Sequence, residues 1–170
     1  GGSTNTLLHL PAIANEAGIA FDMEMVREIA ARVPNLVRIK PSGQHFPADL
    51  DKAGGITALM RQLLETGLLR DSLTVTGEMI SSNVAGAKVR DSSVIRPMDS
   101  PYSTTGGLAL LYGNLAPAGA VCKAAGVLPN MLQHTGPARV FDQEEDAVKA
   151  IYEGRINKGD VVVVRHEGPK

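Results

Sequence analysis

The stretch Ser92–Val127, SSVIRPMDSPYSTTGGLALLYGNLAPAGAVCKAAGV, decides the fold class of this chain. Upstream of Lys88 the apolar residues recur at helical spacing, whereas from there on glycine, proline and β-branched residues take over. Short apolar runs between Pro/Gly turns are typical of β-strands. The strands expected in this stretch are 93–96, 106–113 and 119–126.

Downstream of this stretch the pattern predicts a strand, a helix and a second strand. Residues 137–142 form a further apolar run, and a helix is expected over 143–153. Asp142 and Glu145 have the spacing of a capping box at the start of that helix. The run VVVVR, 161–165, is apolar without alternation, which is typical of a strand buried on both faces.

Upstream of the stretch the spacing of apolar residues predicts helices. Ser3 is expected to cap a first helix that Gly18 ends. Pro11 lies inside this helix and predicts a kink or a late start, because proline lacks the N–H of a helical hydrogen bond. Asp22 is expected to cap a second helix that ends before Pro34.

A third helix is the most clearly amphipathic segment of the chain. Its apolar face runs from Ile56 to Leu64, and Gly67 is expected to end it. Two short extended segments, 35–39 and 73–75, are expected on either side of this helix.

These patterns together predict an α/β chain in two parts. The first part has the character of helices from an α/β domain, and the second that of a compact β-rich module with one helix. We place the boundary at residues 88–93, which gives one domain over 1–90 and another over 91–170.

Composition limits the partners that this chain can have. With 170 residues and 44% hydrophobic content it can bury a core. A net charge of −1 with interspersed signs gives no basic stripe for nucleic acid and no polybasic segment for a membrane surface. The single cysteine, Cys122, cannot form an internal disulfide and is expected to be a buried, inert thiol. A cytoplasmic chain, or one in an organelle matrix, is therefore expected.

The chain opens with GGSTN, directly before the first expected helix. In one interpretation the glycines, Ser3, Thr4 and Asn5 present backbone N–H groups and polar side chains to a carboxylate or phosphate at a helix N-terminus. In the other, Ser3 only caps the helix and the glycines only permit a tight turn. The nucleotide-binding motifs GxxxxGK(S/T) and GxGxxG are absent from the sequence.

Other candidate residues are scattered. His45 and Asp49 have a spacing that could chelate a metal, or His45 is a solvated turn residue. The polar loops DSPYST, 99–104, and HTGPAR, 134–139, could bind a carboxylate through their hydroxyls and Arg139, or could simply satisfy their own backbones. Residue patterns alone therefore indicate no complete active site.

Several segments, in order from the first residue to the last, resemble one family. They are GGSTN…HLPAIA, KPSG, DLDKAGGI, LLETGLL…SLTVTGEMI, VIRPMDSPYSTTGGLALLYGNLAPAGAVCKAAGV, HTGPARVFDQEEDAVKAI and GDVVVVRHEGPK. The chain is similar to the dihydroxy-acid dehydratase and 6-phosphogluconate dehydratase family of iron–sulfur enzymes. Within this family, KPSG and HTGPARVFDQEE resemble the dihydroxy-acid dehydratase branch more closely.

The resemblance implies dehydration of a 2,3-dihydroxy carboxylic acid to a 2-keto acid, in branched-chain amino-acid biosynthesis or sugar-acid catabolism. In the family an iron–sulfur cluster with Mg²⁺ acts on the departing C3 hydroxyl, and a serine alkoxide removes the C2 proton. The family's cluster and metal ligands and its serine base match no position here, and Cys122 is not assigned as a ligand. The chain by itself is therefore expected to be inactive, with no catalytic and no metal-binding residue assigned.

The resemblance also implies an architecture. The chain would be an interior fragment: the helical end of an α/β N-terminal domain, followed by the first part of a β-barrel-like swivelling (β/β/α) domain. Ser3, Thr4 and Asn5 are the candidate substrate-binding residues. The full-length enzyme is expected to be a homodimer that takes a small dihydroxy acid and binds neither nucleic acid nor membrane. The alternative is a stand-alone module on this scaffold that binds a small acid or a partner.

Overall fold

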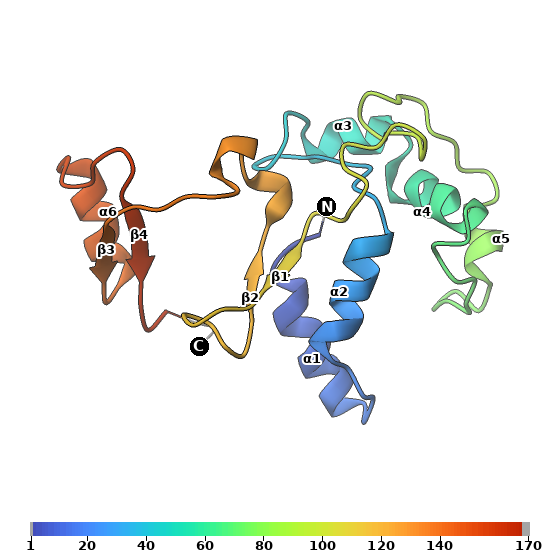
Figure 1. Ribbon diagram of the computed structural model, residues 1–170. Coiled ribbons are helices and arrows are strands. Elements are labelled where there is room, and N and C mark those ends of the chain that lie inside the picture. The colour runs from blue at the N-terminus through green and yellow to red at the C-terminus, as the bar shows by residue number, and fades with distance from the viewer. Residues whose placement is uncertain (1, 168–170) are drawn as a thin grey trace. The chain divides into compact units, whose positions relative to one another are not determined.

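A computed structural model of the chain describes residues 2–167 (Figure 1). The chain divides into two compact units, Gly1–Val127 and Leu128–Lys170. Helices and short strands are mixed, so the predicted α/β class is confirmed. Within residues 2–167 the strands form two separate two-stranded sheets and no closed barrel. Gly1 of GGSTN and residues 168–170 of the last family-like segment lie outside the described residues.

The first unit is mainly helical, with one short β-hairpin at its end (Figure 1). Its elements in chain order are α1 (Thr6–Glu16), α2 (Met23–Arg32), α3 (Pro47–Lys52), α4 (Gly55–Glu65), α5 (Ile80–Val84), β1 (Ala109–Leu111), β2 (Ala120–Cys122) and the 3₁₀ helix η1 (Ala124–Gly126).

Helix α1 begins later than the sequence predicts. The prediction that Ser3 caps it is wrong, because Asn5 occupies the N-cap position and its side chain makes no capping hydrogen bond. Ser3 instead accepts a hydrogen bond on Oγ from the Asn5 backbone N–H, at 3.3 Å. Pro11 lies inside the helix, which continues to Glu16, and Gly18 follows in the left-handed region at φ 66°.

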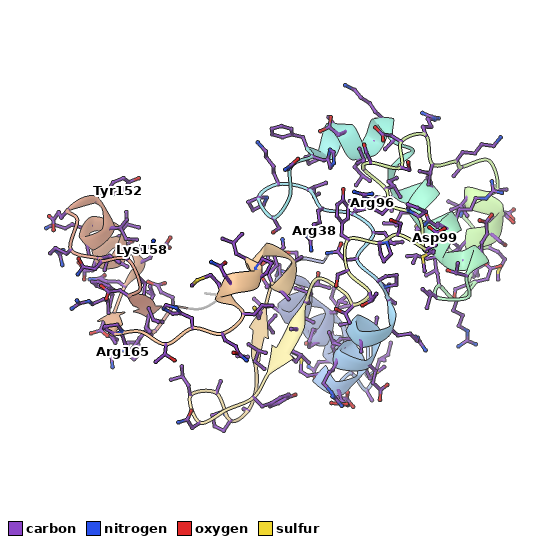
Figure 2. The ribbon with its side chains drawn as sticks, turned by 45° about the horizontal axis from the view of Figure 1, so that its top comes forward. Arg38, Arg96, Asp99, Tyr152, Lys158 and Arg165 are labelled. Atoms are coloured by element: carbon purple, nitrogen blue, oxygen red, sulfur yellow. The ribbon has the colours of Figure 1, made fainter. Side chains whose placement is uncertain are left out.

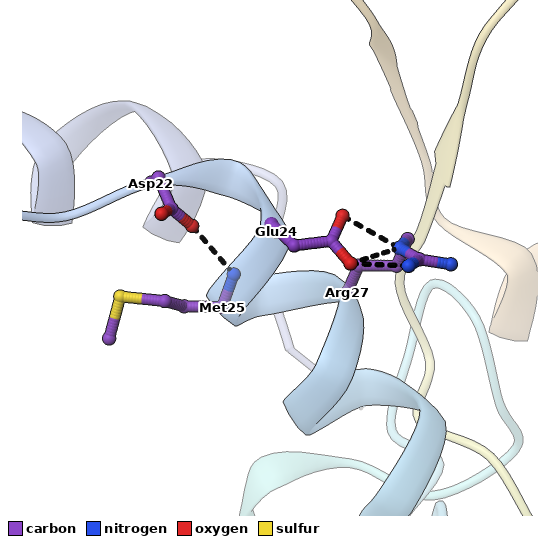
Figure 3. A network of polar contacts seen from close by, with 4 residues as sticks. All are labelled: Asp22, Glu24, Met25 and Arg27. Atoms are coloured by element: carbon purple, nitrogen blue, oxygen red, sulfur yellow. Dashed lines mark hydrogen bonds and ion pairs between the residues drawn. The ribbon is translucent and has the colours of Figure 1, made fainter.

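Helix α2 starts where the sequence predicts. Asp22 accepts a hydrogen bond from the Met25 backbone N–H at 2.8 Å, which satisfies one of the free donors of the first turn (Figure 3). One turn along, the Arg27 guanidinium hydrogen-bonds the Glu24 carboxylate, and this bond holds the pKa of Glu24 below its ordinary value. Both contacts stabilise the first turns of the helix. Acidic groups at this end of a helix also interact favourably with the helix dipole.

Replacing Asp22 with alanine is expected to destabilise the first unit by about 1 kcal/mol, because the Met25 N–H loses its acceptor. Urea unfolding followed by helical circular dichroism measures the change. Glu28→Ala, an exposed acidic residue within the same helix, is the matched control and is expected to change stability little. An equal loss in both variants would contradict the capping role.

The core of the first unit lies between α3, α4 and the segment that follows α5. It is made of apolar side chains that are 8% exposed or less: Leu50, Ala53, Ala58, Val94 and Ile95. Helix α4 was predicted to bury the face from Ile56 to Leu64, but Ala58 is its one buried residue in this structure, and Ile56 is 57% exposed. The apolar face of α4 is therefore only partly covered in the described chain.

Three predicted strands of the first unit are not strands. Residues 35–39 are extended, whereas Ser93 and Val94 lie in a turn, and a single bridge joins Val37 to Ile95, with a further bridge from Asn35 to Ser103. Residues 73–75 contribute one bridge, from Leu73 to Met79. A β-ladder needs successive residues of one strand to pair with residues of a second strand. An apolar run forms no ladder when no partner strand lies beside it.

The hairpin β1–β2 agrees with two of the predicted strands, although both are shorter than expected. Ala109 pairs with Cys122, and Leu111 with Ala120, in antiparallel register. The rest of the predicted strand 119–126 turns into η1. Cys122 is a free thiol and is half-buried.

The second unit contains the 3₁₀ helix η2 (Pro129–Met131) and a small βαβ arrangement of β3 (Ala138–Phe141), α6 (Glu144–Tyr152) and β4 (Val161–Val164). The two strands are parallel, with Ala138 opposite Val161 and Phe141 opposite Val164. The prediction that β4 is buried on both faces is wrong, because Val161, Val162 and Val164 are 37–38% exposed. In a two-stranded sheet both strands are edges, and a single helix cannot cover both faces.

The predicted capping box of α6 is also wrong. Gln143 occupies the N-cap position without a side-chain cap. Asp142 instead accepts a hydrogen bond from Nε of Arg165, at 2.7 Å, while the Glu144 backbone N–H donates to Glu167. The residues that hydrogen-bond to the start of α6 come from the chain after β4. The local spacing of residues in the sequence does not reveal these partners.

Asp160 ties the turn before β4 to β3. Its side chain is 3% exposed and accepts hydrogen bonds from the Asn157 backbone N–H and from Nε of Arg139, each at 2.9 Å. These two donors, the backbone N–H first, hold the pKa of Asp160 below its ordinary value. Arg139 of the HTGPAR loop is thus engaged inside the unit.

The stability that Asp160 contributes should depend on pH. Because its folded pKa is lowered, the contribution is present above the ordinary carboxyl pKa of about 3.9 and is lost as the pH falls through the folded value. Asp160→Asn is expected to lower the melting temperature of the second unit at pH 7, and this difference from wild type should shrink below about pH 4. Scanning calorimetry across pH measures it, with Asp99→Asn as an exposed control. A difference that stays constant down to pH 2 would contradict this role.

No helix among residues 2–167 is long and apolar enough to cross a membrane.

Candidate functional site

The predicted substrate-binding residues lie together in one exposed turn before α1. The backbone N–H groups of Thr6, Leu7 and Leu8 donate to the carbonyls of Ser3, Thr4 and Asn5, at 3.0–3.1 Å. The N–H groups that open the helix are therefore already used within the turn. What this turn offers to a ligand is mainly the Thr4 hydroxyl and the Asn5 amide.

A polar cavity of the first unit lies elsewhere, between the extended segment 35–39, the loop after it, and the segment 93–102. We call it the arginine pocket. Its volume is about 580 Å³, and its lining residues are Arg38, Ser42, Gly43, Gln44, His45, Ser93, Arg96 and Tyr102. Arg38 and Arg96, labelled in Figure 2, come from different segments of the chain.

The backbone around Arg96 is fixed by the core beneath it. Ile95, the preceding residue, is fully buried. The Arg96 N–H donates to the Leu36 carbonyl at 2.9 Å, and its own carbonyl accepts from the Gln62 side chain of α4 at 3.0 Å. Arg96 thus leaves the core at a defined point, with its side chain toward the pocket.

Arg38 is held by the loop 40–45, which folds back against it. The Lys40 N–H donates to the His45 carbonyl at 2.8 Å. A Cβ atom on Gly43 would lie 2.3 Å from the Arg38 carbonyl oxygen, so no other residue fits there without a shift. The KPSG sequence therefore packs its glycine directly on the Arg38 backbone.

Tyr102 joins the two arginines. The Arg38 and Arg96 guanidinium carbons lie 5.3 Å and 4.9 Å from the centre of its ring, which is the distance range of cation–π contacts. The Tyr102 hydroxyl donates to the Ser93 carbonyl at 2.6 Å, and its backbone N–H donates to the Asn35 carbonyl at 2.9 Å. The ring is thereby anchored at both ends.

The arginine pocket is positively charged. Its lining holds two arginines and a histidine but no carboxylate. Within residues 2–167 neither Arg38 nor Arg96 forms an ion pair, and their Nε atoms are buried without an acceptor. An unpaired buried cationic donor is unfavourable, and an oxyanion is the group that relieves it.

Asp91, next to the pocket, is already engaged. Its carboxylate accepts hydrogen bonds from the Ser93 hydroxyl at 2.6 Å and from the Ser93 backbone N–H at 2.8 Å. These bonds, with a smaller contribution from the charge of His45, hold the pKa of Asp91 below its ordinary value. Asp91 therefore stays ionised beside the pocket and neutralises part of its charge from outside.

The residues present do not fit a metal or an iron–sulfur cluster. Among residues 2–167, no three His, Cys, Asp or Glu side chains come together at a metal-binding distance, and the sequence has one cysteine. Asp49, the predicted partner of His45, accepts the Phe46 N–H at 2.7 Å as part of the start of α3. His45 and Asp49 both line a second cavity. Its carboxylates, Asp49 and Asp91, are balanced by the cationic side chains of Lys52 and Arg90, which disfavours a metal cation there.

Residue patterns alone missed Arg38 and Arg96. Each stands in a segment, NLVRI or SVIR, that was interpreted as an apolar strand. The usable signal was an arginine within a run expected to be buried, because arginine is almost never buried unless it has a partner. The DSPYST loop was singled out, and its Tyr102 is part of the pocket.

The geometry thus defines a helical α/β unit with a cationic pocket, followed by a small βαβ unit. Comparison with known proteins gives the family. Residues 1–83 match the description "Dihydroxy-acid/6-phosphogluconate dehydratase N-terminal", and residues 93–170 match "Dihydroxy-acid/6-phosphogluconate dehydratase C-terminal". The chain belongs to the dihydroxy-acid/6-phosphogluconate dehydratase family.

Curated relatives agree with this assignment. The chain is 58% identical to the dihydroxy-acid dehydratase of Carboxydothermus hydrogenoformans, 56% to that of Acetivibrio thermocellus and 54% to that of Agathobacter rectalis. Each alignment covers 100% of this chain and 31% of the relative. The chain therefore spans about a third of the length of these relatives.

Proposed function

We propose that the protein carrying this chain is a hydro-lyase that converts a 2,3-dihydroxy carboxylic acid to a 2-keto acid and water. The supporting observation is the similarity to dihydroxy-acid dehydratases along the whole chain, at 58% identity in one relative. In this reaction the C2 proton and the C3 hydroxyl leave as water, and the resulting enol tautomerises to the ketone. An iron–sulfur cluster and Mg²⁺ belong to this proposal as groups held outside these 170 residues.

The proposal assigns this chain a scaffold and binding role. Residues 1–90 form the end of the N-terminal domain and residues 91–170 the start of the swivelling domain. By itself the chain is inactive in this proposal, because the proton-removing and metal-binding groups lie elsewhere in the protein. The whole enzyme is proposed to be a cytoplasmic homodimer of branched-chain amino-acid biosynthesis.

The test is an activity assay on the whole protein encoded by the gene. The protein is purified without oxygen, supplied with iron, sulfide and Mg²⁺, and given 2,3-dihydroxy-3-methylbutanoate. Formation of 3-methyl-2-oxobutanoate supports the proposal. 2-Hydroxy-3-methylbutanoate is the control, because it lacks the C3 hydroxyl that must leave. Binding of the dihydroxy acid without any keto acid formed would favour the alternative, a small-acid binding module.

The proposal keeps Ser3, Thr4 and Asn5 as substrate-binding residues. In the whole enzyme Asn5→Ala is expected to raise the KM for the dihydroxy acid about tenfold, since a polar contact to substrate is lost. Ser3→Ala is expected to act in the same direction and more weakly, because the Ser3 hydroxyl already accepts the Asn5 N–H. Steady-state kinetics measure both. Unchanged KM and kcat in both variants would remove this turn from the site.

A further inference from the structure

We propose that the arginine pocket is a binding site for a small organic acid, with the carboxylate of the acid held between Arg38 and Arg96. Nothing in the resemblance to the family assigns this pocket. The assignment rests on the residues that line the pocket and is independent of the proposed dehydratase activity.

The first support is charge. Two guanidinium groups share one aromatic ring, and within residues 2–167 neither has a carboxylate partner. Two neighbouring cations repel each other, and the repulsion is stronger in a partly buried site than in water. The negative charge of a bound carboxylate offsets this repulsion. The carboxylate also accepts hydrogen bonds from both guanidinium groups.

The second support is preorganisation. The backbone of Arg96 is hydrogen-bonded on both sides, Gly43 packs against the backbone of Arg38, and Tyr102 is anchored at its hydroxyl and its N–H. Groups held in place before binding lose little entropy when the ligand arrives. The pocket is therefore built on fixed backbone rather than on free surface side chains.

The third support is size and polarity. A volume of about 580 Å³ lies within the range of roughly 300–1,000 Å³ that small-molecule sites occupy. Ser42 and Gln44 add neutral donors and acceptors to the lining, which suit hydroxyl groups on the acid. The chemistry thus favours a short hydroxy acid over a large or apolar anion.

The probe is 2-hydroxy-3-methylbutanoate, and its neutral amide is the matched control because the two differ only at the carboxylate. Both are titrated calorimetrically against the whole protein at low ionic strength. The acid is expected to bind at least about tenfold more tightly than the amide, since bonds from guanidinium to carboxylate are charge-assisted. Equal affinity for the acid and the amide would overturn the proposal, as would tighter binding of inorganic phosphate than of the acid.

Substitutions locate the binding. Arg38→Gln and Arg96→Gln are each expected to reduce affinity for the acid about tenfold or more and to leave the amide unchanged. Arg38→Lys keeps the positive charge but loses the bidentate guanidinium group. Its affinity for the acid should therefore lie between those of the wild type and the glutamine variant. Arg70→Gln removes an exposed arginine outside the pocket and should have no effect. Wild-type affinity in both glutamine variants, with their folding verified by circular dichroism, would also overturn the proposal.

Steady-state kinetics distinguish whether the acid bound in the pocket is the substrate or a different acid. If the pocket holds the carboxylate of the substrate, Arg38→Gln raises KM in step with the loss of probe binding. If it holds a different acid, probe binding is lost while KM stays unchanged. Either result supports the site. A protein that binds the acid through these arginines yet forms no keto acid would contradict the dehydratase proposal and leave the pocket assignment standing.

Discussion

Replacing Gly54 with alanine is expected to destabilise the first unit by roughly 3 kcal/mol, the largest effect of any single substitution considered for this chain. Gly54 has φ 124°, a conformation that residues with a side chain rarely adopt. A Cβ atom there would also lie 2.3 Å from the Lys88 carbonyl oxygen and 2.8 Å from Cβ of Ala58. The substitution thus combines backbone strain with a clash against rigid backbone.

The effect is expected to be large because Gly54 is half-buried and directly follows Ala53, a residue of the core. It stands between α3 and α4, and the adjacent Ala53 is 1% exposed and accepts the Arg90 N–H at 2.8 Å. The segment from Lys88 then continues into Val94 and Ile95, which are 3% and 0% exposed. Pushing Lys88 away therefore loosens the packing on which Arg96 depends.

Thermal unfolding of the whole protein measures this prediction. Gly86→Ala is the matched control, because Gly86 has no positive φ and no atom within 4 Å of the added Cβ. The control is expected to keep the melting temperature of wild type within a degree or two, whereas Gly54→Ala should lower it by about 10 °C or more. Similar melting temperatures for both variants would show that the chain relaxes around Gly54.

The helices of the first unit were the most predictable part of the fold, since their signals are local. Asp22 caps α2 through a contact three residues away, and α4 ends just before Gly67, which has φ 70°. The strands were less predictable, because a strand exists only with a partner. The runs NLVRI and SVIR meet through one bridge instead of a ladder, and their spacing in the sequence could not show this.

The candidate site was only partly predictable for the same reason. The resemblance to the family rests on contiguous motifs, and comparison with known proteins confirmed it. The arginine pocket depends on residues from two distant segments, and their meeting is set by the hydrogen bond from Arg96 to Leu36 and by the burial of Ile95. The opening turn Ser3–Asn5 was found from its sequence, but the use of its carbonyls by Thr6, Leu7 and Leu8 required the structure.

Gly43 gives the second large prediction, because it connects the KPSG loop to the arginine pocket. The three atoms nearest to an added Cβ all belong to Arg38: the carbonyl oxygen at 2.3 Å, the carbonyl carbon at 2.5 Å and Cβ at 2.7 Å. Gly43→Ala must therefore displace either the loop or Arg38. We expect a loss of stability of about 2 kcal/mol and a loss of acid affinity of about tenfold or more, since binding needs Arg38 in place.

Calorimetric titration with 2-hydroxy-3-methylbutanoate, alongside thermal unfolding, measures both parts of this prediction. Gly113→Ala is the matched control, as nothing lies within 4 Å of its added Cβ, and it should change neither quantity. The two readouts separate the causes. A variant that melts lower but binds the acid as wild type does would show that the loop moves and Arg38 stays. Loss of both stability and acid binding would show that the glycine of KPSG keeps Arg38 in position. The motif would then have a physical role in acid binding.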